Sequence, residues 1–205
     1  MITRTMNLNG KPDEGHITRE AALILKSGGI VAIPTETVFG LACNGDDESA
    51  VKKLYKLKNR PSGKPLVVQI DRVARLADYG VSLGTGIQRI LNKFWPGPLT
   101  VLMETPGGKT GFRMPNNKAA LSIIAAADFS VFVTSANMSG ETELVSALDV
   151  IEAFGGLIDA VVDDGTRATG IASTVLDCTR PPFKILRQGA ISRKLTQFLG
   201  YDQRH

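Results

Sequence analysis

The chain has 205 residues, of which 43% are hydrophobic, and carries a formal net charge of +4 at pH 7. That length and apolar content allow a packed core and argue against global disorder, while the mild positive charge favours an anionic ligand without naming one. No apolar run is long enough to span a membrane, and the first thirty residues contain no hydrophobic segment of a secretion signal. The two cysteines, Cys43 and Cys178, form neither a CxxC pair nor a disulfide framework. We therefore expect a soluble, cytoplasmic protein.

Helix and strand patterns alternate along the chain. Thr18 is predicted to cap a first helix, which Gly28 and Gly29 end, and a buried strand follows at 30–33. A second helix begins at Asp46 or Asp47, and Pro61 is predicted to end it. Further helices are predicted at 84–94, 117–127, 146–154 and 192–199, with strands at 66–70, 99–103, 131–134, 159–163, 173–177 and 183–187. The pattern predicts one α/β domain over residues 1–205, built on a twisted mixed sheet flanked by helices.

A basic run crosses the end of the second predicted helix. It contains six cations and no acid: Lys52, Lys53, Lys56, Lys58, Arg60 and Lys64. Such a cluster repels itself unless an anion neutralises it, which favours a polyphosphate or nucleic-acid site. A solvated helix face is the alternative for the first three lysines. Lys58 and Arg60 differ from them, because Pro61 would place both at the helix end.

Two common kinds of site are disfavoured by residue spacing and composition. The segment GGKT at 107–110 has Met103 where a phosphate-binding loop needs its first Gly, and the residues at 111–115 cannot form the required helix. Because His16 and His205 are the only histidines, a Ser-His-Asp triad or a histidine-rich metal cluster is nearly excluded. Any chemistry would then depend on electrostatic stabilisation and positioning.

Polar segments adjoin several predicted strands. They are Pro34 to Gly40, Arg113, Thr134 to Gly140, Gly170 to Val175 and Ile185 to Gly189. An arginine at a strand end can hold a carboxylate through its planar fork, and the segment at 134–140 offers hydroxyls, an amide and close backbone approach to a nucleotide. An ordinary turn or a surface ion pair explains each segment taken alone. Their shared position at strand ends predicts that they converge on one rim.

In this order, PTETVFG, KNRPSGKPL, WPGPLT, FRMP, TSANMSG, ASTVLD and ILRQG resemble the signature of the YrdC-like family of threonylcarbamoyl-AMP synthases, over about residues 18–190. The resemblance implies a nucleotidyltransferase that joins L-threonine, bicarbonate and ATP into threonylcarbamoyl-AMP and releases pyrophosphate, for threonylcarbamoyladenosine modification of tRNA. It also implies a basic concave face on the sheet, and Mg²⁺ carried by the ATP phosphates instead of protein ligands. The partners implied are tRNA or double-stranded RNA and a downstream tRNA threonylcarbamoyl transferase.

The resemblance also implies roles for particular residues, motif by motif. The catalytic pair would be Lys58 and Arg60. ATP would be bound by Lys58, Arg60, Lys64, Thr110, Ser135, Ala136, Asn137 and Arg187. L-threonine would be bound by Thr35, Gln69, Arg113, Thr134 and Ser173.

The chain departs from the family pattern at several positions. Gln69 stands where the family commonly has His, and Gln cannot take up a proton near neutral pH. Phe39 replaces the usual Tyr, and Glu141 and Glu143 add negative charge where Pro and Ser are usual. The sequence also lacks the extra C-terminal domain of longer members, so any lid from that domain is expected to be absent.

Two alternative functions stay open on the same fold. One is binding of double-stranded RNA or the ribosome without catalysis, and the other is formation of a carbamoyl-adenylate for another acceptor. Aromatic residues make up 6% of the chain, fewer than expected for base stacking on a surface, which favours an enzyme.

Overall fold

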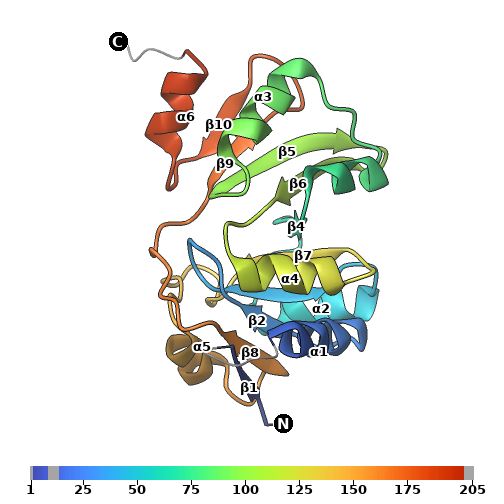
Figure 1. Ribbon diagram of the computed structural model, residues 1–205, viewed down its shortest axis with the longest axis vertical. Helices are drawn as coiled ribbons and strands as arrows, with labels where there is room; N and C mark the ends of the chain where they lie inside the picture. Colours follow the sequence, from blue (N-terminus) through green and yellow to red (C-terminus); the bar gives the residue numbers. More distant parts are fainter. Residues whose placement is uncertain (1, 9–13, 201–205) are drawn as a thin grey trace.

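The computed structural model describes residues 2–8 and 14–200. Across these residues, ten strands form one mixed sheet in the order β1-β8-β2-β3-β7-β4-β6-β5-β9-β10, which runs the length of the molecule (Figure 1). The strands are β1 (Arg4–Asn7), β2 (Val31–Ile33), β3 (Gly40–Asn44), β4 (Val67–Gln69), β5 (Leu99–Thr105), β6 (Gly108–Arg113), β7 (Val131–Ser135), β8 (Ala160–Asp163), β9 (Thr174–Asp177) and β10 (Lys184–Arg187). The predicted α/β fold with a mixed sheet is confirmed.

Helices flank the sheet along its length. In the described ranges they are α1 (Glu14–Lys26), α2 (Glu48–Leu57), η1 (Val73–Tyr79), α3 (Thr85–Phe94), α4 (Lys118–Ala126), α5 (Ala147–Phe154) and α6 (Ser192–Phe198). Side-chain caps explain why several predicted starts are confirmed. Asp47, Asn117 and Ser146 each accept hydrogen bonds from backbone amides of the first turn. None of the helices in residues 2–8 and 14–200 is both long and apolar enough to cross a bilayer.

The predicted start of the first helix is wrong. The helix begins at Glu14, and Thr18 lies inside it, where its hydroxyl donates to the carbonyls of Glu14 and Gly15. A Thr hydroxyl can bond to the preceding turn from within a helix, so the residue type alone did not define a cap. The predicted end is confirmed, because Gly28 has φ +80° and Gly29 donates to the carbonyl of Ile24.

The end of α2 is set by Asn59, not by Pro61 as predicted. Asn59 has φ +48°, and the amides of Asn59 and Arg60 donate to the carbonyls of Lys56 and Tyr55. This Schellman pattern closes the helix before the proline is reached. Lys58 is therefore the C-cap, and the chain reverses direction between Lys58 and Arg60.

Two strands, β1 and β3, had no counterpart in the sequence prediction, and of β6 only the end at Arg113 was predicted. Strands β1 and β3 are short and pair with partners distant in the sequence, β8 for β1 and β7 for β3, whereas β6 contains two Gly residues and pairs with β5 in a hairpin. The GGKT segment lies in the turn and first residues of the β5–β6 hairpin, since Thr105 pairs with Gly108 and Met103 with Thr110. The rejection of a phosphate-binding loop at this place is confirmed.

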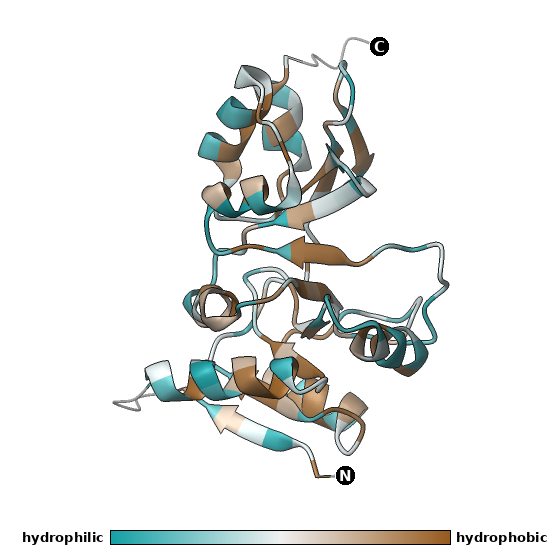
Figure 2. Ribbon diagram, turned by 90° about the vertical axis from the view of Figure 1, so that its right-hand side faces the viewer, coloured by the Kyte–Doolittle hydropathy of each residue, from teal (hydrophilic) through white to brown (hydrophobic). Residues whose placement is uncertain are grey.

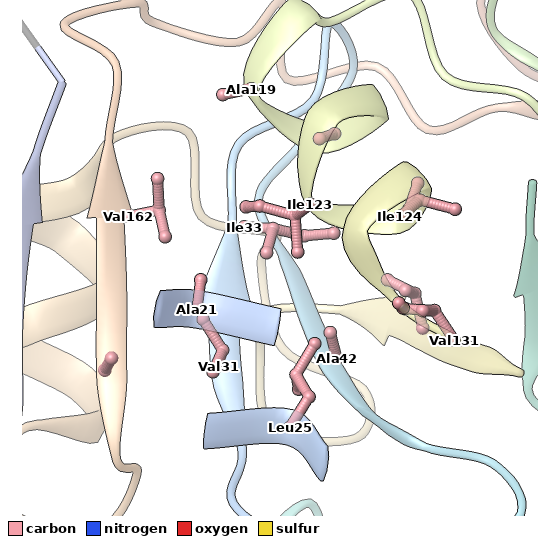
Figure 3. Packing of buried hydrophobic residues seen from close by; sticks show 14 of the residues in the cluster. Ala21, Leu25, Val31, Ile33, Ala42, Ala119, Ile123, Ile124, Val131 and Val162 are labelled. Atoms are coloured by element: carbon pink, nitrogen blue, oxygen red, sulfur yellow. The ribbon is translucent and has the colours of Figure 1, made fainter. Parts of the chain in front are cut away.

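Strand alternation divides the buried residues between the two faces of the sheet. In β2, Val31 and Ile33 pack under α1 and α4, as Figure 3 shows, whereas Ala32 belongs to the cluster under α2 and α5. In the other half of the molecule, η1, α3 and α6 cover one face through a third cluster. Figure 2 shows hydrophobic residues dominating the central strands and alternating with hydrophilic ones along the helices.

Candidate functional site

A pocket of about 290 Å³ lies on the sheet face that α3 and α6 do not cover. Each of the five polar segments that the sequence placed at strand ends contributes to its lining, through Thr35, Arg113, Thr134, Ser135, Ser173 and Arg187. The other polar lining residues are Arg60, Gln69, Thr100 and Glu143. The predicted convergence on one rim is therefore confirmed.

The period of two in the strands explains why polar side chains reach this pocket. In β5, Val101 and Met103 point into the core cluster, so Thr100 and Leu102 point into the pocket. In β4, Val68 is in the core and Gln69 lines the pocket. The pocket floor thus continues the sheet, and the loops after β2, β7 and before β9 supply its rim.

Arg113 ends β6 and is 7% exposed. Its Nη2 donates to Thr37 Oγ1 at 2.8 Å and lies 2.9 Å from Glu36 Oε1 in an ion pair. Thr35 donates its one hydroxyl proton to the Val38 carbonyl at 2.6 Å, so the Thr37 hydroxyl must donate to Thr35 Oγ1 at 2.9 Å. The hydrogen bonds run in one direction from the guanidinium to the backbone, which fixes the arginine and occupies the Thr35 hydroxyl.

Two buried polar atoms beside each other have no partner among the described residues. They are Arg113 Nε, a donor, and Gln69 Oε1, an acceptor. Gln69 and Arg113 are paired across β4 and β6, so their side chains point to the same face, and both line the pocket. Buried polar groups in folded proteins normally have a partner. The two atoms therefore suit a ligand that offers both an acceptor and a donor.

Lys58 is 2% exposed, and it faces the loop after β7 instead of lining the pocket. Its ammonium donates to Thr134 Oγ1 at 3.3 Å, to Asn137 Oδ1 at 3.2 Å and to the Ser135 carbonyl. These three bonds use all its protons. Burial, followed by the nearby charge of Arg60, lowers the pKa of Lys58 to about 8, and Glu143 acts in the opposite direction.

Arg60 and Arg187 bring positive charge to the pocket wall. Arg60 donates to the carbonyls of Lys64 and Pro65 at 3.0 and 2.9 Å. Arg187 donates to the Ser173 carbonyl and hydroxyl, the latter at 3.0 Å, and burial lowers its pKa. Lys64 itself is exposed and lies outside the pocket wall; its carbonyl is what fixes Arg60.

Three further residues predicted for the nucleotide do not line the pocket. Ala136 is fully buried in the core, and its amide donates to the Phe39 carbonyl. Asn137 is 9% exposed and joins Lys58 to the Ser135 hydroxyl. Thr110 bonds within the β5–β6 hairpin, 3.2 Å from Thr105 Oγ1. Asn137 can act by holding the loop, whereas Thr110 has no contact with this site.

The remaining predicted residues lie at the pocket. Thr134, Ser135 and Ser173 all line it, and Ser173 Oγ is 2.9 Å from Thr100 Oγ1. Sequence reasoning gave no individual role to Glu36, Thr37 or Thr100, and it noted Glu143 only as a departure from the family pattern. Glu36 and Thr37 lie inside the PTETVFG motif and Thr100 inside WPGPLT, so the motifs themselves carried the signal.

Glu143 is the only carboxylate among the described residues that line the pocket. Its negative charge partly offsets the lowering of the pKa of Lys58 and of Arg187, so it acts as a counter-charge to the cationic wall. No cluster of three or more metal-ligating side chains occurs in the part of the chain that the structure describes.

We expect Glu143→Gln to tighten binding of metal-free ATP about threefold, because it removes the negative charge that opposes the cationic wall. Titration calorimetry with ATP, in EDTA and then with Mg²⁺, measures this effect. Glu141→Gln, an exposed neighbour, is the matched control. Weaker binding of MgATP to Glu143→Gln would instead mean that this carboxylate binds the Mg²⁺.

Fold and pocket together define an α/β protein with a polar pocket that carries three arginines, on the sheet face that α3 and α6 do not cover. The chain belongs to the Sua5/YciO/YrdC family, since the model of that family, described as "Telomere recombination", matches residues 23–189. It is 35% identical to the threonylcarbamoyl-AMP synthase of Pyrococcus abyssi over 200 residues, which cover 93% of this chain and 58% of the relative. It is also 35% identical to the enzyme of that name from Bacillus subtilis, covering 85% of this chain and 54% of the relative.

The fold agrees with a solved structure of the same family. The crystal structure of P. abyssi Sua5 complexed with L-threonine superposes with a TM-score of 0.90 at 32% identity, covering 97% of this chain and 61% of that chain. The chain thus spans less than two thirds of the length of these relatives.

Proposed function

We propose that this chain is an L-threonylcarbamoyladenylate synthase, which converts L-threonine, bicarbonate and ATP into threonylcarbamoyl-AMP and pyrophosphate. The observation that carries the proposal is that Arg113 Nε, a donor, and Gln69 Oε1, an acceptor, are both buried without a partner among the described residues, on residues that face each other across β4 and β6 at the pocket floor. Family membership and the names of the relatives support it. As a substrate, ATP would be bound as its Mg²⁺ complex.

The amino acid would bind at the pocket floor. Its carboxylate would accept from Arg113, and its ammonium or hydroxyl would donate to Gln69 Oε1. Thr134 and Ser173 would line the remaining wall. Thr35 would position Arg113 through Thr37, since its own hydroxyl proton is already donated to Val38.

The triphosphate would lie along the cationic wall. Arg60 and Arg187 line the pocket and would contact its oxygens, while Ser135 would border the nucleotide. Lys58 does not line the pocket, so it would act indirectly, by donating to the Ser135 carbonyl and to Asn137 and by adding a positive charge. Fixed cations of this kind offset the negative charge that develops on a departing pyrophosphate.

The reaction can be written with balanced atoms. The neutral α-amine attacks bicarbonate, a C–N bond forms, and water leaves to give the carbamate. A carbamate oxygen then attacks the α-phosphorus in line, while the bond to the bridging oxygen of the β-phosphate breaks. The protein's contribution is orientation and charge, consistent with a pocket wall that contains no histidine.

One set of incubations tests the proposed function. The purified chain is mixed with ATP, Mg²⁺ and bicarbonate, with and without L-threonine, and pyrophosphate and the adenylate are measured by mass spectrometry. We expect an adenylate whose formation depends on threonine. In a third incubation, an ammonium salt replaces L-threonine as the source of nitrogen; a carbamoyl-adenylate formed there would favour transfer to another acceptor, and no adenylate in any of the three would overturn the proposal.

Direct RNA binding is a weaker candidate. Lys52 and Lys53 belong to the basic run that favoured a nucleic-acid site in the sequence analysis. Lys52 forms an ion pair with Glu48 at 2.8 Å, and Lys53 forms one with Asp159 at 3.0 Å. The basic run is therefore partly neutralised by acids from the same helix and from the segment before β8. The tRNA pathway, the downstream transferase and the cytoplasmic location stay predictions from the resemblance and the sequence.

A further inference from the structure

Glu36 is a charged residue that the proposed reaction does not yet use. It follows β2 in the PTETVFG motif, and its carboxylate lies 2.9 Å from Arg113 Nη2. Both carboxylate oxygens are buried and lack a partner with hydrogen-bond geometry among the described residues. Glu36 contacts Arg113 without lining the pocket. Burial of an anion at this place therefore needs an explanation beyond surface pairing.

The ion pair changes what Arg113 can attract. A lone buried guanidinium would bind any carboxylate strongly. With Glu36 already beside it, a second carboxylate would experience repulsion from the first at close range, in a site with little water to screen it. A simple carboxylic acid should therefore bind Arg113 weakly.

A ligand with its own positive charge avoids this repulsion. In an α-amino acid the ammonium is attached to the carbon that bears the carboxylate, so both charges enter the site together. The ammonium would be attracted by the Glu36 carboxylate and could donate a hydrogen bond to Gln69 Oε1. Gln69 is 5% exposed, and its Oε1 has no partner among the described residues. The three groups together are complementary to a zwitterion and not to an anion.

We propose that Glu36 makes the Arg113 site selective for a zwitterionic α-amino acid over the corresponding carboxylic acid. Glu36 acts through Arg113 as a positioning and specificity residue and does not touch the reacting atoms. This inference rests on the proposed function, because it takes L-threonine as the ligand of the Arg113 site. It adds a reason why the pocket would reject the many metabolites that carry a carboxylate alone.

The test compares two ligands that differ only in the amine. L-threonine and (R)-3-hydroxybutyrate, which is threonine without its α-amine, are titrated without ATP into the unaltered chain and into Glu36→Gln. Competition between the two ligands, followed by calorimetry or NMR, gives their affinity ratio even where one binds weakly. Glu152→Gln removes the same charge from an exposed position on α5 and is the matched control.

We expect Glu36→Gln to tighten (R)-3-hydroxybutyrate about tenfold and to change L-threonine by less than about threefold, because the charges of the zwitterion largely compensate. Glu36→Asp, which keeps the charge, should keep the preference for threonine. Thermal unfolding of each variant checks that it is folded. If Glu36→Gln does not fold, the affinity ratio of the two ligands is compared between Glu36→Asp and the unaltered chain.

Other outcomes have distinct meanings. If Glu36→Gln weakens both ligands equally, Glu36 only supports the structure, and if both tighten equally, it only competes with the ligand; either result overturns the inference. An unchanged preference for threonine in Glu36→Gln, or a lost one in Glu36→Asp, does the same. If the unaltered chain does not bind L-threonine at all, the proposed function falls, and the inference falls with it.

Discussion

Lys58→Met should lower the rate of adenylate formation by at least about 100-fold while the chain stays folded. The ammonium holds Thr134, Ser135 and Asn137 in place and supplies a buried positive charge behind the proposed phosphate site. Its loss leaves the Ser135 carbonyl without that donor, which costs stability, but it also removes a buried charge, which restores stability.

The measurement is single-turnover adenylate formation together with thermal unfolding. Lys56→Met is the control, because Lys56 lies on the same helix and is exposed. Full activity in Lys58→Met would show that the lysine has no part in the reaction. Loss of folding would show that its role in the core outweighs its role at the site.

Because the pKa of Lys58 is lowered, we expect ATP binding to depend on pH. Since burial and Arg60 bring that pKa to about 8, the ammonium loses its proton as the pH rises from 7 to 9. The attraction for a polyanion falls with the proton, so we expect ATP affinity to decrease about tenfold over this range. Calorimetric titrations at both pH values test this, and the decrease should be absent in Lys58→Met.

Arg113→Lys should weaken L-threonine binding about 100-fold and leave ATP binding within about twofold. Lysine keeps a positive charge beside Glu36, which protects the fold, but it loses the planar fork and with it the free Nε. Titration of each ligand separately resolves the two effects. Arg72→Lys, at an exposed arginine next to β4, is the control.

Equal losses of threonine and ATP binding in Arg113→Lys would mean that the variant distorts the whole pocket. Unchanged threonine binding would move the carboxylate site to another cation on the wall, with Arg187 as the next candidate.

Local signals predicted the elements that carry their own caps or periodicity. The helices that start after Asp47, Asn117 and Ser146 were predicted to within a residue, because each capping side chain satisfies amides in the next turn. Strands β1 and β3 were missed, because their partners β8 and β7 are far away in the chain, and only the end of β6 was predicted, because its two Gly residues weaken the strand pattern. Asn59 was overlooked as the end of α2, since Pro61 is the more conspicuous breaker.

Most residues of the site could be predicted from the sequence, but the hydrogen bonds between them could not. The sequence placed Arg60, Arg113, Ser173 and Arg187 at strand or helix ends, and all four line the pocket. It could not show that the Lys58 ammonium donates all three of its hydrogen bonds to residues 134–137, at the end of β7 and just after it. These residues come close to Lys58 only through the folding of the sheet.

The sequence by itself determined the α/β class, the ordered motifs and the family, because these depend on residue types and spacing along the chain. Only the tertiary structure decided which polar groups lack a partner and which charges stand together, as with Glu36, Arg113 and Gln69. The physical reason is that hydrogen bonding and electrostatics act over a few ångströms of space, and the distances between β2, β4 and β6 are set by strand order and not by sequence separation.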